Sequence, residues 1–204
     1  MMKISVPNTE RFIVSAPERD YFGGSQEWYE DARRKKSGCG AVAAANIIWY
    51  MAKSDGRFRG LADIDGGGKD SFIKLMEEMF SYITPGPFGV NRPEMFSAGA
   101  ICYAAERGVD IKAKTLEAFK PGKIDLEEAR GFVSSCLAES SPTAFLNLSN
   151  GALKNLDNWH WVTIIAIDDE TNGALICDAG NSFEINFGEW VETTLLGGAF
   201  VALH

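Results

Sequence analysis

Cys39 stands between two glycines at the start of a long apolar run, "SGCGAVAAANIIWYM", residues 37–51. The nucleophilic form of cysteine is the thiolate, and a free thiol with a pKa of about 8.5 is mostly protonated at neutral pH. A helix N-terminus carries partial positive charge and favours an anion placed there. Gly38 lets the chain turn into the helix, and Gly40 leaves the sulfur unscreened. The pattern predicts an activated nucleophile; the alternative is a buried cysteine in an Ala-rich helix, which is a common environment for free cysteine.

A nucleophilic cysteine needs a base, which is usually histidine. The chain contains two histidines, His160 and His204. His204 is the last residue, and terminal residues are often mobile. We therefore expect His160, at the head of the strand-like segment "HWVTIIAI", to be the base. The alternative is a histidine whose hydrogen bonds are satisfied at a sheet edge.

A third group should orient the imidazole and favour its charged form. The segment "ALICDAG" follows a turn near residues 169–172, so it is expected to run back antiparallel to the strand of His160. Its Asp178 is the preferred partner, although Asn181 lies nearly opposite His160 in the simplest register. A register shift of one residue reverses the face of every side chain, so both candidates stay open. Asp178 could also be an ordinary acid at a strand end.

The spacing of apolar residues predicts helices in the first part of the chain and strands in the second. We expect helices over 39–53, 71–83, 93–108 and 125–140, with Asp70 or Ser71 capping the second, and early strands near 11–16 and 109–119. Strands are expected over 143–149, 160–167, 174–180, 182–187 and 198–203. This order indicates an α+β fold. We expect one domain, 1–204, with a helical lobe over about 1–140, an antiparallel β lobe over about 141–204 and a cleft between them.

Composition narrows the classes of partner. The 204 residues have a formal net charge of −8, which favours neither nucleic acid nor anionic lipid as a partner. The one basic run, Arg33 to Lys36, is either a solvated loop or a basic rim that favours acidic substrates. No run of eighteen apolar residues predicts a membrane span, and the first twenty residues lack a signal-peptide pattern, so we expect a cytoplasmic protein.

Cofactor and metal motifs fail on their spacing. Four cysteines, none in a C-x-x-C pair, fit neither a zinc site nor a disulfide framework, which favours reduced thiols. The segment "DIDGGGKDS", residues 63–71, lacks the spacing of a phosphate loop or a calcium loop, and we expect a plain loop there. No metal and no organic cofactor is expected.

Three blocks of the chain resemble the papain-like cysteine peptidases, and most closely their bacterial branch related to double-glycine leader peptidases. The blocks are "SQEWYEDARRKKSGCGAVAAANIIWY", "NWHWVTIIAID" and "LICDAGNSFEINFGEW". That branch has a Gln, then G-C-G before a helix of small residues, then H-[WY]-V-x-[VI] on a strand, and an Asp on the next strand. Residues 54–140 carry no part of the resemblance.

The resemblance implies a papain-like fold and a thiolate–imidazolium pair of Cys39 and His160, with Asp178 as the orienting acid. It also implies that Gln26 donates to the oxyanion and that a peptide or other amide is cleaved through a thioester. The sequence departs from the branch in three places: Gln26 lies 13 residues before Cys39, Ala-Val follows Gly40 where Pro-Thr is common, and Ala follows Asp178 where Pro is frequent.

Other functions stay open at this point. An acyltransferase could use the same residues, and a binding module could keep the fold without activity. An unrelated α+β protein could hold these residues apart. Leader peptidases are usually fused to a transporter, so leader cleavage is not carried over to this chain.

Overall fold

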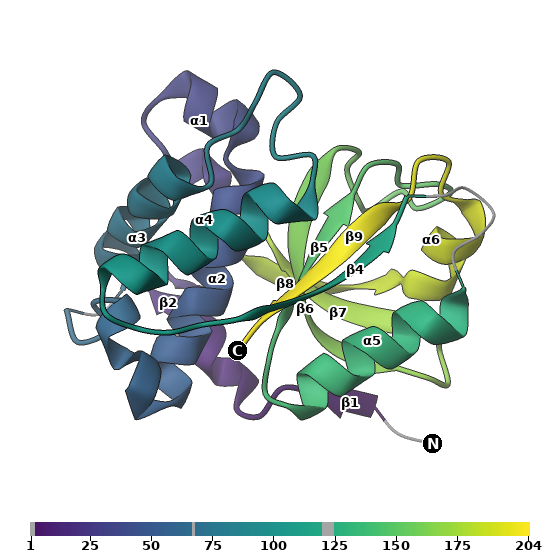
Figure 1. Ribbon diagram of the computed structural model, residues 1–204, viewed down its shortest axis with the longest axis horizontal. Coiled ribbons are helices and arrows are strands. Elements are labelled where there is room, and N and C mark those ends of the chain that lie inside the picture. The colour runs from purple at the N-terminus through teal and green to yellow at the C-terminus, as the bar shows by residue number, and fades with distance from the viewer. Residues whose placement is uncertain (1–2, 67, 120–124) are drawn as a thin grey trace.

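The computed structural model describes residues 3–66, 68–119 and 125–204. Helices and an antiparallel sheet lie side by side, with α1–α4 at the left and the sheet at the right of Figure 1. The α-helices are α1 (Ala32–Ser37), α2 (Cys39–Ser54), α3 (Lys69–Tyr82), α4 (Pro93–Glu106), α5 (Leu126–Ala138) and α6 (Phe187–Thr193). The 3-10 helices are η1 (Thr9–Phe12), η2 (Gln26–Trp28) and η3 (Gly56–Leu61). The strands are β1 (Lys3–Ser5), β2 (Ile13–Ser15), β3 (Asp20–Phe22), β4 (Ala113–Ala118), β5 (Thr143–Asn147), β6 (His160–Asp168), β7 (Gly173–Asp178), β8 (Asn181–Asn186) and β9 (Gly198–Leu203).

The main sheet is antiparallel and has the strand order β4-β9-β5-β6-β7-β8. The first half of β6 pairs with β5, and its last three residues pair with β1. Strands β2 and β3 form a separate two-stranded sheet. β6 is therefore paired on both sides from Thr163 to Asp168, while its first residues, beginning with His160, pair with β5.

Helix α2 lies between the other N-terminal helices and the sheet, with residues packed all round. Thirteen of its 16 residues are buried, as expected for a helix without a polar face. A Cβ on Gly40 would come within 3.2 Å of Val90 and 3.4 Å of Trp161, so glycine allows the first turn of α2 to approach α4's leading loop and β6 closely. We had expected Gly40 to leave the sulfur open; its structural role is this packing.

Two hydrophobic clusters lie on either side of the sheet. One joins α2, α3 and α4 to side chains of β5, β6 and β9, and includes Trp161 stacked on Phe96 at 4.7 Å between ring centroids. The other joins α5 and α6 to the opposite side, around Phe145, Trp190 and Phe200. α5 covers the sheet in Figure 1. Both faces of the sheet are therefore covered by packed side chains at the end where β6 begins and β7 finishes, next to α2.

Most expected elements are present. The four long helices and the five strands after residue 142 are confirmed within a few residues, as are the early strands at β2 and β4. The expected cap of α3 is wrong: its N-cap is Gly68, at φ 100°, and no side chain caps it. Helices α1 and α6 and strands β1 and β3 were not expected. β1 and β4 join the main sheet from before residue 140, so the sheet draws on both halves of the chain.

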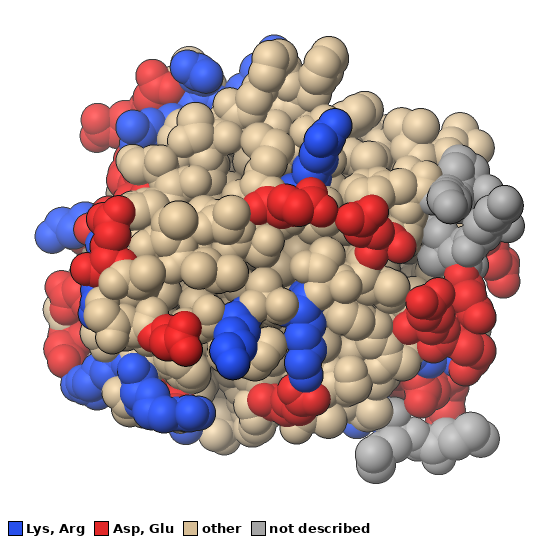
Figure 2. Space-filling model, viewed as in Figure 1, with Lys and Arg blue, Asp and Glu red and all other residues tan. Residues whose placement is uncertain are grey.

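Charges on the surface are mixed. On the face shown in Figure 2, basic and acidic side chains are interspersed, and acidic side chains gather at the right-hand edge beside α5. Among the described residues, no helix is both long and apolar enough to cross a membrane.

Candidate active site

Cys39 is the first residue of α2 and lines a small cleft of about 180 Å³. The residues of the cleft come from the segment before α1, from α2 and from the facing ends of β6 and β7. Among them are Gln26, Cys39, Asn46, His160, Cys177 and Asp178. All four residues expected to act in catalysis therefore line one cleft.

Gly38 fixes how the chain enters α2. Its backbone, at φ −86° and ψ −1°, is helical, so glycine is not needed there for a special conformation. A Cβ at this position would instead lie 2.4 Å from the Tyr29 ring and 2.5 Å from the carbonyl oxygen of Arg34. Glycine thus lets α1 and α2 meet at a tight corner, with Cys39 at that corner.

His160 contacts Asp178 directly. The distance between His160 Nε2 and Asp178 Oδ1 is 2.8 Å, and the two side chains are 12% and 22% exposed. Because Nε2 faces the carboxylate, Nδ1 is the ring nitrogen left for a second partner. Asn181 is turned elsewhere: its side-chain amide donates to the carbonyl oxygen of Ala179.

A β-bulge decides between Asp178 and Asn181. Ala166 pairs with Leu175, and continuing that register would pair Thr163 with Asp178. The register shifts between Ile164 and Ala166, and Thr163 pairs with Cys177 instead. Since neighbouring residues of a strand point to opposite faces, the shift moves Asp178 to the face of His160.

The charged imidazole is stabilised strongly. Burial opposes the charge on His160, but the hydrogen bond with Asp178, the hydrogen bond with Cys39 and the Coulombic attraction of both groups outweigh it. Together they raise the pKa of His160 from its ordinary value of 6.5 to about 10. Cys39 and His160 line the same cleft, as the first residues of α2 and β6.

Gln26 is the first residue of η2 and also lines the cleft. Its Oε1 is buried and has no hydrogen-bond partner among the described residues. Rotating the side-chain amide by 180° exchanges the positions of its C=O and NH2 groups. Because Oε1 has no hydrogen bond, this rotation breaks no hydrogen bond of Oε1. The side chain can therefore donate to an anion near Cys39.

Asn46 connects the three segments that carry these groups. It is 2% exposed and lies two helical turns after Cys39. Its Oδ1 accepts from the N–H of Gly24, two residues before Gln26, at 2.9 Å. Its Nδ2 donates to Thr163 Oγ1 on β6 at 3.3 Å. We did not single out Asn46 from the sequence; a lone amide inside an otherwise apolar helix is the signal that marks it.

A wider groove of about 520 Å³ lies on the other side of Cys39. Apolar side chains from the loop before α4, from β5 and next to His160 line it, including Phe88, Val90, Leu146 and Trp159. Arg33 and Lys36 of α1 line its rim. Cys39 thus stands between a narrow polar cleft and a broad apolar groove.

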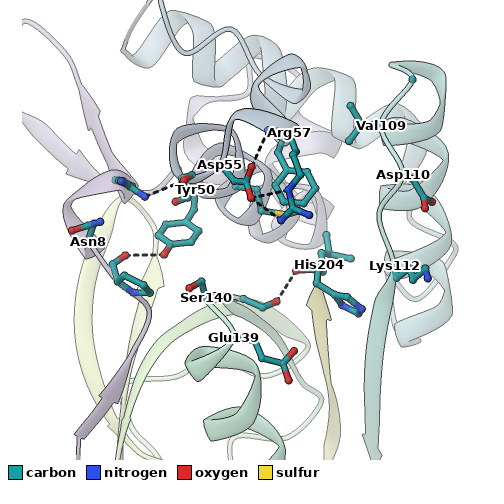
Figure 3. A pocket seen from close by; sticks show the side chains of 18 residues that line it. Asn8, Tyr50, Asp55, Arg57, Val109, Asp110, Lys112, Glu139, Ser140 and His204 are labelled. Atoms are coloured by element: carbon teal, nitrogen blue, oxygen red, sulfur yellow. Dashed lines mark hydrogen bonds and ion pairs between the residues drawn. The ribbon is translucent and has the colours of Figure 1, made fainter.

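A larger cavity lies elsewhere. About 770 Å³ opens at the C-terminal end of α2, between Tyr50, Arg57, Lys112 and His204 (Figure 3). Arg57 there is paired with Asp55, and Tyr50 donates to the carbonyl oxygen of Pro7. None of the expected catalytic residues lines this cavity.

The remaining thiols lie in different surroundings. Burial raises the pKa of Cys136 and of Cys177, so both favour the neutral thiol. Cys102 is exposed on α4. Within the described part of the chain, no group of three His, Cys, Asp or Glu side chains could hold a metal ion.

Three solved structures of bacterial proteins are similar to this chain. One is the N-terminal peptidase C39 like domain of a toxin secretion ATP-binding protein from Vibrio parahaemolyticus, with 15% identity, a TM-score of 0.37 and coverage of 79% of this chain and 94% of that one. Another is xylellain, a cysteine protease from Xylella fastidiosa, with 16% identity, a TM-score of 0.44 and coverage of 98% and 85%. A third is the Pseudomonas avirulence protein AvrPphB, with 12% identity, a TM-score of 0.38 and coverage of 83% and 92%.

No family model and no curated protein sequence matches the chain. At these identities and TM-scores the three solved structures describe a likeness of fold. The activity has to be argued from the cleft itself.

Proposed function

We propose that this protein is a cysteine peptidase or amidase in which Cys39, His160 and Asp178 form the catalytic triad. One observation carries the proposal: the first residue of a buried helix, the first residue of β6 and the last residue of β7 converge in one cleft. The hydrogen bond between His160 and Asp178, and the interaction of His160 with Cys39, support these roles.

The first half of the reaction forms a thioester. The Cys39 thiolate attacks the carbonyl carbon of an amide, and the carbonyl oxygen becomes an oxyanion. The Gln26 side chain and the backbone N–H of Cys39 donate to that oxyanion. As the C–N bond breaks, His160 gives its proton to the leaving amine, and the acyl group stays on the sulfur.

The second half returns the enzyme to its starting state. Neutral His160 takes a proton from water, the resulting hydroxide attacks the thioester carbon, and the C–S bond breaks. The products are a carboxylic acid, which loses its proton to solvent, and the regenerated Cys39 thiolate beside a charged imidazole. Asp178 holds Nε2 throughout, which keeps Nδ1 directed at the sulfur and at the water.

Alkylation by iodoacetamide tests the activated thiolate without a known substrate. At pH 6 an ordinary thiol is almost fully protonated, so we expect Cys39 to react at least tenfold faster than Cys102, Cys136 or Cys177. Peptide mapping by mass spectrometry measures the four rates in one sample. His160→Ala should remove the advantage of Cys39, and Cys102→Ser should leave it unchanged. Equal rates at all four thiols would contradict the proposal.

A further inference from the structure

The basic residues just before Cys39 divide into two sets. α1 is anchored through Arg34, whose guanidinium pairs with Glu77 and lies 4.9 Å from the Phe80 ring centroid. Arg33 and Lys36, three residues apart on one side of α1, line the groove instead. Within the described part of the chain, neither forms an ion pair. Basic side chains are visible over α1 at the upper left of Figure 2.

This charge is local to the groove. The chain as a whole carries a net charge of −8, but no described residue lining the groove is acidic. The catalytic cleft on the other side of Cys39 is lined by Glu27, Asp157 and Asp178. The charged residues that line the groove are therefore all basic, whereas the cleft combines its three carboxylates with His160, which is paired with Asp178.

The floor and tip of the groove are apolar. Gly86 and Gly89 exchange two backbone hydrogen bonds of 3.1 Å, which close a tight turn and hold Phe88 outward. Phe88 is 74% exposed and Trp159 is 51% exposed, although both are large apolar side chains. Exposed aromatic side chains around one groove commonly mark a binding surface.

We propose that the groove selects the substrate: it seats a peptide segment that carries a large apolar side chain between Phe88 and Trp159 and a carboxylate side chain on Arg33 and Lys36. Charge complementarity favours an acidic segment, and the apolar lining favours an apolar residue beside it. This inference rests on the proposed peptidase function and adds the class of peptide that the site cleaves.

A peptide library prepared by tryptic digestion of a bacterial lysate tests the inference. The library is incubated with the protein, and new termini are mapped by mass spectrometry. We expect Asp and Glu to be enriched within four residues of the cleavage site, together with a large apolar residue. Arg33→Gln/Lys36→Gln should lose the acidic enrichment. Phe88→Ala should lose the apolar enrichment.

The best-cleaved peptide is then synthesised with its Glu or Asp and with the matching amide. We expect the wild type to prefer the acidic peptide about three- to tenfold in kcat/KM, the range for two exposed ion pairs, and less at high salt. Lys36→Gln should reduce this preference. Lys35→Gln, the neighbouring lysine of α1 outside the groove, is the matched control and should leave it unchanged.

The outcomes separate the two proposals. Cleavage without acidic enrichment, or enrichment that persists in Arg33→Gln/Lys36→Gln, would overturn the groove inference and leave the peptidase standing. Selective alkylation of Cys39 without cleavage of any library peptide would also overturn it, since the groove would then not seat a peptide. Equal alkylation of all four thiols together with no cleavage would remove the peptidase itself.

Discussion

The two ends of α2 differ in a way that cavity size does not predict. At its N-terminal end a cleft of about 180 Å³ holds Cys39, Gln26, His160 and Asp178. At its C-terminal end a cavity of about 770 Å³ holds charged groups such as Asp55 and Arg57 that are paired with each other. A reactive site needs several polar groups that face the same atom. Among the described residues of these two pockets, those of the small cleft have that arrangement.

The largest expected effect is at the nucleophile and the base. Cys39→Ala and His160→Ala should each reduce hydrolysis of fluorescein-labelled casein by about 10³-fold or more, because each removes a bond-making group or the proton donor. Cys39 contributes little to packing, so Cys39→Ala should change the melting temperature by only a few degrees, whereas His160→Ala also breaks the ion pair with Asp178 and should lower it further. Casein hydrolysis that survives Cys39→Ala would place the activity in another site.

Gln26→Ala should have the second-largest effect on activity. Loss of one oxyanion donor typically lowers kcat by about 10²- to 10³-fold and changes KM little. Gln26→Glu is the matched variant, because it keeps the shape of the side chain and places an acceptor where a donor is needed. Steady-state kinetics on casein or on a library peptide separates kcat from KM. A change confined to KM would assign Gln26 to substrate binding instead.

Asp178→Asn should change how activity depends on pH. The folded-state pKa of His160 is raised to about 10, so the imidazolium persists across neutral and mildly alkaline pH and is lost only as pH rises through about 10. Replacing the carboxylate by an amide removes the attraction that raises the pKa, which then falls towards 6.5 or below. At pH 8.5 a histidine with a pKa of 6.5 is about 1% charged, so activity relative to pH 6 should fall by about 10²-fold.

The pH–rate profile of kcat/KM measures that change. Its alkaline limb should move down by about two pH units or more in Asp178→Asn, while the acidic limb moves less. Asn181→Ala is the control, since Asn181 donates to Ala179 and does not contact His160. If the two variants have the same profile as the wild type, Asp178 does not set the charge of His160.

Comparison of sequence and structure explains why Asp178 was uncertain. The pattern of apolar residues places β6 and β7 and their turn, because two apolar runs of strand length flank a turn sequence. The bulge between Ile164 and Ala166 has no such signal: Ile165 is one more apolar residue in an apolar strand, and its insertion moves Asp178 to the other face. Backbone register is a property of pairing, which is not encoded in either strand alone.

The same contrast applies to α2. Its length, burial and first residue follow from composition, because an apolar run after Gly-Cys-Gly has few alternatives. Which other segments lie against α2 does not follow from its composition. Gly40 admits Val90 and Trp161, and Asn46 binds Gly24 and Thr163, at sequence separations that no local pattern encodes. The sequence therefore places the residues that we propose as catalytic in one cleft more readily than it identifies the residues that hold them in place.

Replacing Asn46 should reduce activity less than replacing a residue of the triad, because Asn46 positions other residues and takes no part in the reaction. Asn46→Ala leaves the buried Gly24 N–H unsatisfied, which costs about 1–3 kcal/mol, and removes the donor to the Thr163 hydroxyl, which still donates to the carbonyl oxygen of Ala43. We expect kcat to fall about tenfold with KM nearly unchanged, because Gln26 and His160 lose their common support. Thr163→Val keeps the hydrogen bond between Asn46 and Gly24, so its kcat should fall less.

Ser141→Ala is the control for stability alone. Ser141 is also buried, and its hydroxyl donates to Leu203 at the far end of α2. Chemical denaturation should show a loss of stability for both variants, and casein kinetics a loss of kcat for Asn46→Ala only. An equal fall in kcat would mean that Asn46 acts through stability and not through the site.

The far end of α2 should give the smallest effect on activity. Asp55→Ala removes the ion pair with Arg57 and the cap of η3, where Asp55 Oδ1 accepts from the N–H of Arg57. Loss of a helix cap costs about 0.5–2 kcal/mol, so the melting temperature should fall. Casein turnover should stay within about twofold, because nothing at this end touches the cleft. A fivefold change in kcat at unchanged stability would show that the two ends of α2 are coupled, and the contrast between them would no longer hold.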